Sequence, residues 1–230
     1  MRPFLVQLGT MKKRNWILLL AALLLLWIVV DLFFPFKTDL SKIDPVETAR
    51  LEGSMWRSYY EKKPVKLFFQ SAELMRKEFH FSFWQSFHVA YYPAKAAFVF
   101  KDGKGRVDYE KAFPYLKKYY TLINNVSEKD FNADSAARSE LEWWIIRRER
   151  EKHPPEEWER WLALTAAVMY HLPVERFNNY AHLRVQAMLL RDQKGLAITE
   201  RDWQDINKIL LDAWQSFANE LNSPPVSQNE

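Results

Sequence analysis

Two glutamates ahead of two tryptophans are the residues of this chain best suited to acid and base chemistry. The stretch SELEWWIIRRERE, residues 139–151, places Glu140 and Glu142 before Trp143 and Trp144. A carboxyl group packed against tryptophan in an apolar pocket has a raised pKa, as the general acid of a glycan-cleaving enzyme requires. The arginines that follow oppose this reading, because a nearby guanidinium favours the ionised carboxylate. Glu140 and Glu142 are the catalytic candidates, but the sequence favours a structural interpretation of the stretch.

That structural interpretation comes from the helical wheel of the same stretch. At 100° per residue, Leu141 and Ile145 share one face with Trp144, whereas Ile146 lies with Trp143 on the opposite face. The charged bands between the two faces contain oppositely charged side chains four residues apart, Arg138 with Glu142 and Arg147 with Glu151. Such pairs contribute about 0.2–0.5 kcal/mol each on an exposed helix. The pattern predicts a central helix with other helices packed on both of its apolar faces.

His80, His88 and Tyr92 are the candidates for ligand binding. Together with Trp84 they recur every four residues and could form a stripe along one face of a helix. Two turns of helix, about 12 Å, would separate the two histidines. This is too far for one metal ion to bind both without ligands from elsewhere. We therefore expect no metal site and no cofactor, and we interpret each histidine as a surface or core residue.

The sequence also lacks several common catalytic, metal-binding and phosphate-binding motifs. The chain has 0 Cys, which excludes a disulfide framework, a thiolate metal site and a cysteine nucleophile. HExxH and GxSxG do not occur, and KDGKGR, residues 101–106, lacks P-loop spacing and predicts a turn. The Tyr-Tyr pairs at 59–60 and 119–120 could stack on a sugar or a base. We favour tyrosines at interfaces between helices, with the ring buried and the hydroxyl in water.

A long apolar run lies near the N-terminus, and it determines where the rest of the chain is placed relative to a membrane. Every residue from Trp16 to Val30 is apolar, and tolerance of Asp31 extends the run to residues 16–34. As a helix it would rise about 28 Å, close to the roughly 30 Å thickness of the hydrocarbon layer. A cleaved signal peptide is the competing interpretation, but its apolar core of about 7–15 residues is followed by small residues. Here Leu-Phe-Phe-Pro follows Asp31, so we predict an uncleaved signal anchor in the lipid bilayer.

The charges that flank this run predict its orientation. Lys12, Lys13 and Arg14 directly precede it, and Met11 before them is an alternative start site. Because positive residues stay in the cytoplasm, residues 1–15 should form a short cytoplasmic segment. The juxtamembrane linker 35–43 and all that follows should face the periplasm or the exterior. We therefore predict a single-pass protein of the bacterial inner membrane.

The charge of the chain does not predict nucleic-acid binding. Four of the 33 Lys and Arg residues precede the apolar run. One of the 29 Asp and Glu residues, Asp31, lies within it. The remainder therefore carries 29 bases against 28 acids and is almost neutral, in spite of a pI near 9.1. A protein that binds phosphate backbones needs a basic surface. We expect no nucleic-acid partner.

Helix signals recur through residues 44–222, and strand signals do not. Asp44 followed by Pro45 and Glu47 predicts a capped helix start, and Thr199 begins the last helix in the same way. Only 5 Gly in 230 residues argue against a turn-rich β fold. We predict an all-α array or bundle of about six to eight helices, with an α-solenoid as the less favoured alternative. The proline-containing tail, residues 223–230, should be disordered.

Two functions remain open for this anchored, aromatic-rich domain without catalytic motifs. The leading hypothesis is a non-catalytic scaffold or accessory subunit of the envelope, with a protein partner or a second copy of itself. The alternative is an envelope glycan- or lipid-binding protein or hydrolase. It requires a pocket in which Glu140, Glu142, or His80 and His88 converge with tyrosines.

Overall fold

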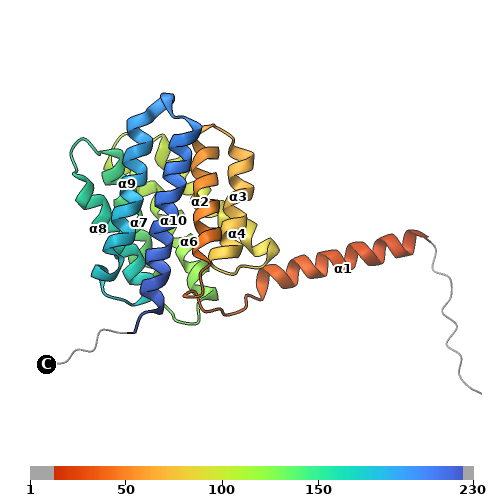
Figure 1. Ribbon diagram of the computed structural model, residues 1–230. Coiled ribbons are helices and arrows are strands. Elements are labelled where there is room, and N and C mark those ends of the chain that lie inside the picture. The colour runs from red at the N-terminus through yellow and green to blue at the C-terminus, as the bar shows by residue number, and fades with distance from the viewer. Residues whose placement is uncertain (1–12, 225–230) are drawn as a thin grey trace, which may run out of the picture.

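The computed structural model describes residues 13–224 and shows an all-helical chain in which one apolar helix projects from a helical body (Figure 1). The projecting helix is α1 (Lys13–Phe33), which has no buried residue and is long and apolar enough to cross a membrane. No β-strand occurs among these residues, although Thr38 and Ser127 form an isolated bridge. The predicted cytoplasmic segment 1–15 and the predicted tail 223–230 lie largely outside the described residues.

Eight helices of 14 residues or more form the body. They are α2 (Pro45–Tyr60), α3 (Pro64–Glu78), α4 (Phe83–Lys101), α6 (Phe113–Val126), α7 (Ala133–Arg148), α8 (Pro155–Tyr170), α9 (Asn178–Lys194) and α10 (Glu200–Asn222). The short helix α5 (Arg106–Tyr109) and three 3-10 turns, at 110–112, 174–177 and 195–197, lie in the connections. The predicted all-α class is therefore confirmed, and the predicted turn at 101–106 leads from α4 into α5.

The eight helices close into a ring. Each packs against the helix before and the helix after it, and α10 packs against α2. Neighbours alternate in direction because most connections are short. As a result, one end of the ring, here called the upper end, is where α2, α4, α7 and α9 all finish (Figure 1). At the opposite, lower end α2 begins and α10 finishes. The α-solenoid alternative is wrong, because the return of α10 to α2 closes the array.

Local signals explain where the ring begins and where its last helix starts. Asp44 Oδ1 accepts hydrogen bonds from the backbone amides of Val46 at 3.0 Å and Glu47 at 3.1 Å, which caps α2. At α10, Thr199 and Asp202 form a reciprocal capping box. Both features bind amide groups that the first turn of a helix leaves unpaired. The capped starts predicted from the sequence are present.

The core lies on both sides of α7. Leu141 and Ile145 belong to a cluster of apolar side chains shared with α3, α4 and α6, whereas Ile146 belongs to a second cluster shared with α8, α9 and α10. The two apolar faces on the helical wheel are thus both buried. The predicted charge pairs within α7 do not form, because Arg138 binds Glu110 at 2.6 Å and Arg147 binds Asp192 on α9 at 2.8 Å. Neighbouring segments offer these arginines closer carboxylates than their own helix does.

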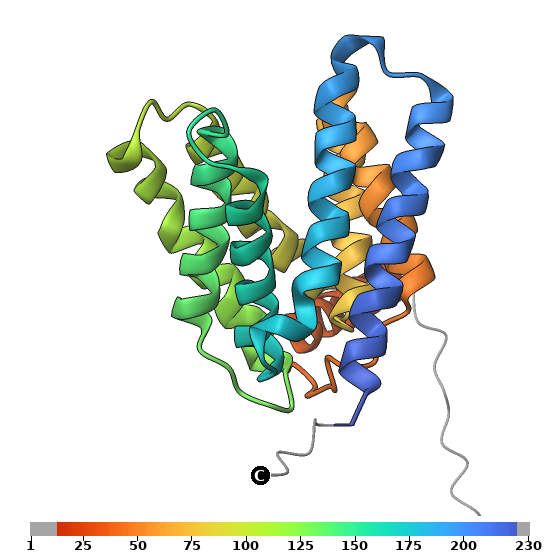
Figure 2. The same ribbon diagram turned by 60° about the vertical axis from the view of Figure 1, so that its left-hand side comes forward.

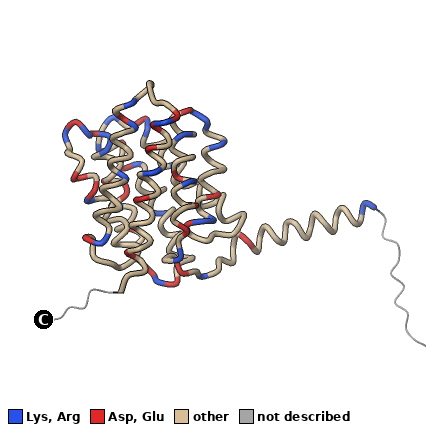
Figure 3. The backbone as a smooth tube through the Cα atoms, in the orientation of Figure 1, with Lys and Arg blue, Asp and Glu red and all other residues tan. Residues whose placement is uncertain are grey.

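A single aspartate joins α1 to the ring. The Oδ2 atom of Asp31 accepts hydrogen bonds from the backbone amides of Trp84, at 2.7 Å, and Gln85, at 3.2 Å. These amides lie in the unpaired first turn of α4, so Asp31 caps a helix whose bonded amide at Trp84 is 53 residues further along the chain. The ring of Trp27 lies 6.2 Å from that of Phe83 and 5.7 Å from that of Trp84. Figure 3 shows this acidic position where α1 meets the ring and the basic residues at the far end of α1.

Replacement of Asp31 tests this cap. Asp31→Ala removes the acceptor and should lower the free energy of unfolding by about 1 kcal/mol, the usual loss for an N-cap. Asp31→Asn keeps an acceptor oxygen and should lose less. Thermal unfolding of the full chain in detergent micelles would measure both variants. A wild-type unfolding temperature for Asp31→Ala would contradict the cap.

Candidate functional site

The ring encloses one central cavity of about 750 Å³, to which all eight of its long helices contribute side chains. Figure 2 shows α7 and α8 in one part of the ring and α9 and α10 in another, and residues of all four helices line the cavity. The volume lies in the range of small-molecule sites. At the upper end the lining includes the exposed side chains of Tyr59, Lys101, Arg148 and Arg150. The lower half is lined by carboxyl, phenol and indole groups, which is unusual for the centre of a helical protein.

A buried ion pair lies in the lower half of the cavity. Glu52 on α2 is only 5% exposed, and one of its carboxylate oxygens binds the guanidinium of Arg184 on α9. The other oxygen accepts a hydrogen bond of 2.6 Å from Nε1 of Trp214 on α10. Arg184 also donates to the hydroxyl of Tyr180 at 3.1 Å. Both charges are therefore compensated inside the ring, as burial of ions requires.

Glu140 on α7 faces the same cavity. Nε1 of Trp144 donates to its carboxylate at 2.8 Å, and the hydroxyl of Tyr120 donates to it at 3.3 Å. Burial raises the pKa of Glu140, and these two hydrogen bonds and the charge of Arg184 oppose that shift only in part. The structure thus places one carboxyl group against tryptophan in a largely apolar pocket.

Glu78, the last residue of α3, is a further carboxyl group that lines the cavity. The Glu78 side chain is partly exposed where it lines the cavity, and protein atoms surround the rest of it. No described residue forms a hydrogen bond or an ion pair with its carboxyl group. Burial, together with the negative charges of Glu52 and Glu140, raises the pKa of Glu78 to about 8, in spite of Arg184. Glu78 is therefore mostly protonated at neutral pH.

Aromatic polar groups complete the lining. Burial raises the pKa of the four tyrosines of the lower half, which keeps their hydroxyls neutral: Tyr119, Tyr120, Tyr170 and Tyr180. The hydroxyl of Tyr170 and Nε1 of Trp143 are buried and have no hydrogen-bond partner in the described part of the chain. Buried polar groups are rarely left unpaired in folded proteins. Both residues line the cavity, but neither of these two atoms is accessible from it.

The other site residues predicted from the sequence lie away from the cavity. Glu142 is on the outside of α7, where it binds the guanidinium of Arg106. His80 precedes α4 in a left-handed backbone conformation (φ 57°) and binds the carbonyl oxygen of Lys42 at 3.0 Å. His88 and Tyr92 lie on the outer side of α4, 3.3 Å apart, so the expected stripe does not extend to His80. Burial and the charge of Lys118 lower the pKa of His88.

Only Glu140 of the predicted residues therefore converges with tyrosines. Within residues 13–224 no three His, Asp or Glu side chains are arranged to hold a metal ion. The sequence interpretation missed Glu52, Glu78 and Arg184, and it assigned Tyr119 and Tyr120 to a structural role. A usable signal existed, because Arg184 is four residues from both Tyr180 and Met188, which are buried on α9, and Glu52 directly follows the buried Leu51. Charges at core-facing positions of a helix indicate either a buried pair or a polar site.

Comparison with protein-family models, curated proteins and solved structures found no match to this chain. Its function has to be inferred from the chemistry of the cavity and from the position of α1.

The raised pKa of Glu78 predicts how stability depends on pH. Because its folded pKa lies above the ordinary value of 4.5, its protonated form favours the folded state. This contribution is full below that ordinary pKa and is lost as pH rises through about 8. Glu78→Gln, which stays neutral, should match the wild type at low pH and be more stable at high pH by about 1–3 kcal/mol. Unfolding at pH 5, 7 and 9 would measure this.

Glu142→Gln is the matched control for Glu78→Gln, since it removes the same charge outside the cavity. It should not gain stability at high pH. Equal pH profiles for wild type and Glu78→Gln would contradict the assigned pKa.

The ion pair gives a second stability prediction. Arg184→Met leaves the buried carboxylate of Glu52 with Trp214 as its only donor, and should cost about 3–5 kcal/mol. The double variant Glu52→Gln, Arg184→Met removes the uncompensated charge and should recover part of the loss. Denaturant unfolding of both variants would test the coupling. A single variant as stable as the wild type would show that the pair is not needed.

Proposed function

We propose that this chain is a membrane-anchored protein of the bacterial envelope that binds a small molecule in the central cavity of its helical ring. The observation that carries the proposal is the convergence of Glu78 and Glu140 with aromatic side chains in a space that can hold a ligand. A ring built only for mechanical stability would fill its centre with apolar side chains. Two carboxyl groups beyond the Glu52–Arg184 pair are costly there unless a ligand uses them.

The lining defines the chemistry of the ligand. Glu140 can balance a positive charge, and so can Glu78 once a bound cation lowers its pKa and it loses its proton. The surrounding tyrosines and tryptophans provide ring faces that attract an organic cation. Lys101, Arg148 and Arg150 at the upper end favour a negative group. The ligand is therefore a zwitterion, with an amine or quaternary ammonium group held deep in the cavity and an acidic group at the entrance.

The anchor assignment is supported by α1. Its 21 residues have no buried member, unlike a core helix of a soluble domain, and its apolar part matches the thickness of a bilayer. The bond from Asp31 to α4 gives α1 a structural role in the mature chain, which favours an uncleaved anchor over a signal peptide. The bases ahead of α1 favour a cytoplasmic N-terminus, with the ring outside the cytoplasm.

The scaffold hypothesis from the sequence remains a prediction, but the cavity favours ligand binding. A hydrolase acting on an envelope glycan or lipid is the second candidate, and Glu78 is the observation that favours it. A carboxyl group protonated at neutral pH beside a second carboxyl group is the arrangement that a general acid and base require. Glu78 would donate a proton to the leaving group and Glu140 would activate water.

Native mass spectrometry of the full chain, extracted from its own membrane, would test the proposal. We expect a small molecule to remain bound to the wild type. Its occupancy should fall at least tenfold in Glu140→Gln, because the substitution removes a charge that balances the cation. Glu142→Gln is the matched control on the same helix and should keep the ligand.

The same experiment separates the candidate functions. Loss of a zwitterionic ligand from Glu140→Gln alone supports the binding protein. Conversion of an added envelope extract by the wild type, but not by Glu78→Gln, would support the hydrolase. A protein partner in place of a small molecule, or equal ligand occupancy in both glutamine variants, would contradict the cavity as the functional site.

A further inference from the structure

A face of exposed aromatic side chains runs along the outside of α3 and α4. It consists of Phe69, Phe83, Phe87, Tyr91 and Phe98, and is called the aromatic face below. Four of its members are well exposed, with 57% for Phe69, 44% for Phe83, 48% for Tyr91 and 63% for Phe98. Contiguous apolar surface of this kind is uncommon on a soluble protein and marks an interaction site.

The aromatic face begins at α1. The ring of Trp27 on α1 stacks on Phe83, and Phe87 lies 5.3 Å from Phe83 and 5.6 Å from Phe69. Tyr91 and Phe98 follow Phe87 by four and eleven residues, which places them on the same side of α4. The aromatic side chains of the proposed membrane anchor thus lead directly into those of the ring.

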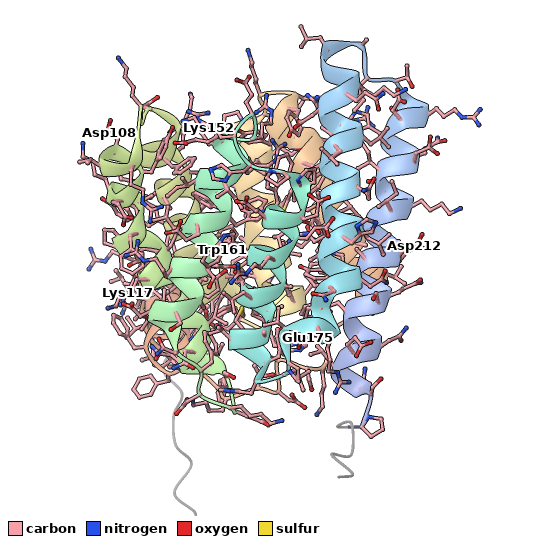
Figure 4. The ribbon with its side chains drawn as sticks, turned by 90° about the vertical axis from the view of Figure 1, so that its left-hand side faces the viewer. Asp108, Lys117, Lys152, Trp161, Glu175 and Asp212 are labelled. Atoms are coloured by element: carbon pink, nitrogen blue, oxygen red, sulfur yellow. The ribbon has the colours of Figure 1, made fainter. Side chains whose placement is uncertain are left out.

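The direction of α1 determines which surroundings the aromatic face contacts. Figure 1 shows α1 projecting sideways from the lower end of the ring, on the side of α3 and α4, rather than continuing in the direction of the ring helices. If α1 crosses a bilayer, the membrane surface at its end runs along the ring helices rather than across them. The side of the ring turned toward that surface is the side of α3 and α4. Figure 4 shows the side away from α1, where Lys117, Lys152, Glu175 and Asp212 project outward.

The charges around the aromatic face suit lipid headgroups. The sequence of α4 contains no Asp or Glu, and it carries Lys95 and Lys101. On α3, Lys66 is exposed and the guanidinium of Arg76 lies 5.5 Å from the ring centre of Phe83 and 5.8 Å from that of Phe87. Aromatic rings with flanking bases are typical of protein surfaces that lie at the boundary between headgroups and acyl chains. Basic side chains near an anionic membrane surface are attracted to it.

We propose that the aromatic face lies on the surface of the phospholipid bilayer from which α1 emerges, with its rings at the level of the headgroups. The ring then rests on its side against the membrane, held by α1 at one end and by α3 and α4 along its length. This inference rests on α1 as the anchor of the proposed function and is independent of the ligand in the cavity.

The absence of cysteine from the sequence allows a direct experiment. Single variants Phe69→Cys and Phe98→Cys of the full chain would carry a nitroxide spin label, after reconstitution into nanodiscs that contain phosphatidylglycerol. Collision rates with oxygen, which concentrates in lipid, and with a water-soluble nickel chelate would place each label. Leu24→Cys on α1 reports whether the anchor is inserted. Arg160→Cys on α8 and Leu196→Cys at the upper end are controls on other exposed surfaces.

We expect the ratio of oxygen to nickel collisions to be several-fold higher at positions 69 and 98 than at 160 and 196. A high ratio at 24 with water-like ratios at 69 and 98 would overturn this inference and leave the anchor intact. Water-like ratios at all five positions would overturn the anchor as well. Labels at 69 and 98 that are shielded from both reagents would show that another protein covers the face, and would also overturn the proposal.

Discussion

The ion pair between Glu52 and Arg184 is the interaction on which the closed ring depends. It lies where the two ends of the helical array meet, since Glu52 is on the first ring helix, Arg184 is on α9, and Trp214 on the last helix binds the same carboxylate. Removal of two charges from water costs several kcal/mol per ion, and only their mutual compensation makes the arrangement tolerable. The pair therefore requires the ring to close in one register, with α2 beside α10.

The same pair keeps the centre of the ring polar. A cavity of about 750 Å³ remains beside these groups. Glu78 and Glu140 line that cavity, and no Lys or Arg side chain of the described residues forms an ion pair with either of them. The chemistry of the proposed ligand follows from this, because a positive group in the cavity could pair with these carboxyl groups and favour their ionised form.

The connection of α1 to the ring links the cavity to the membrane. Asp31 is the only charged residue between Trp16 and Phe36, and its bond to the first turn of α4 sets the direction in which α1 leaves. In the proposed arrangement that direction turns the aromatic face toward the bilayer and leaves the basic entrance of the cavity at the upper end of the ring. A ligand of the envelope could then reach the cavity from the aqueous side of the membrane surface.

The sequence by itself determined the helices of this protein, because apolar periodicity, capping residues and prolines act within a few residues of one another. It also predicted the apolar segment at 16–34 and the two buried faces of α7. Only the tertiary structure decided that Glu140 points into a cavity while Glu142, two residues away, binds Arg106 outside. The choice depends on which side of α7 faces the ring centre. Glu52 and Arg184 meet for a similar reason, since a contact between residues 132 positions apart leaves no trace in local spacing.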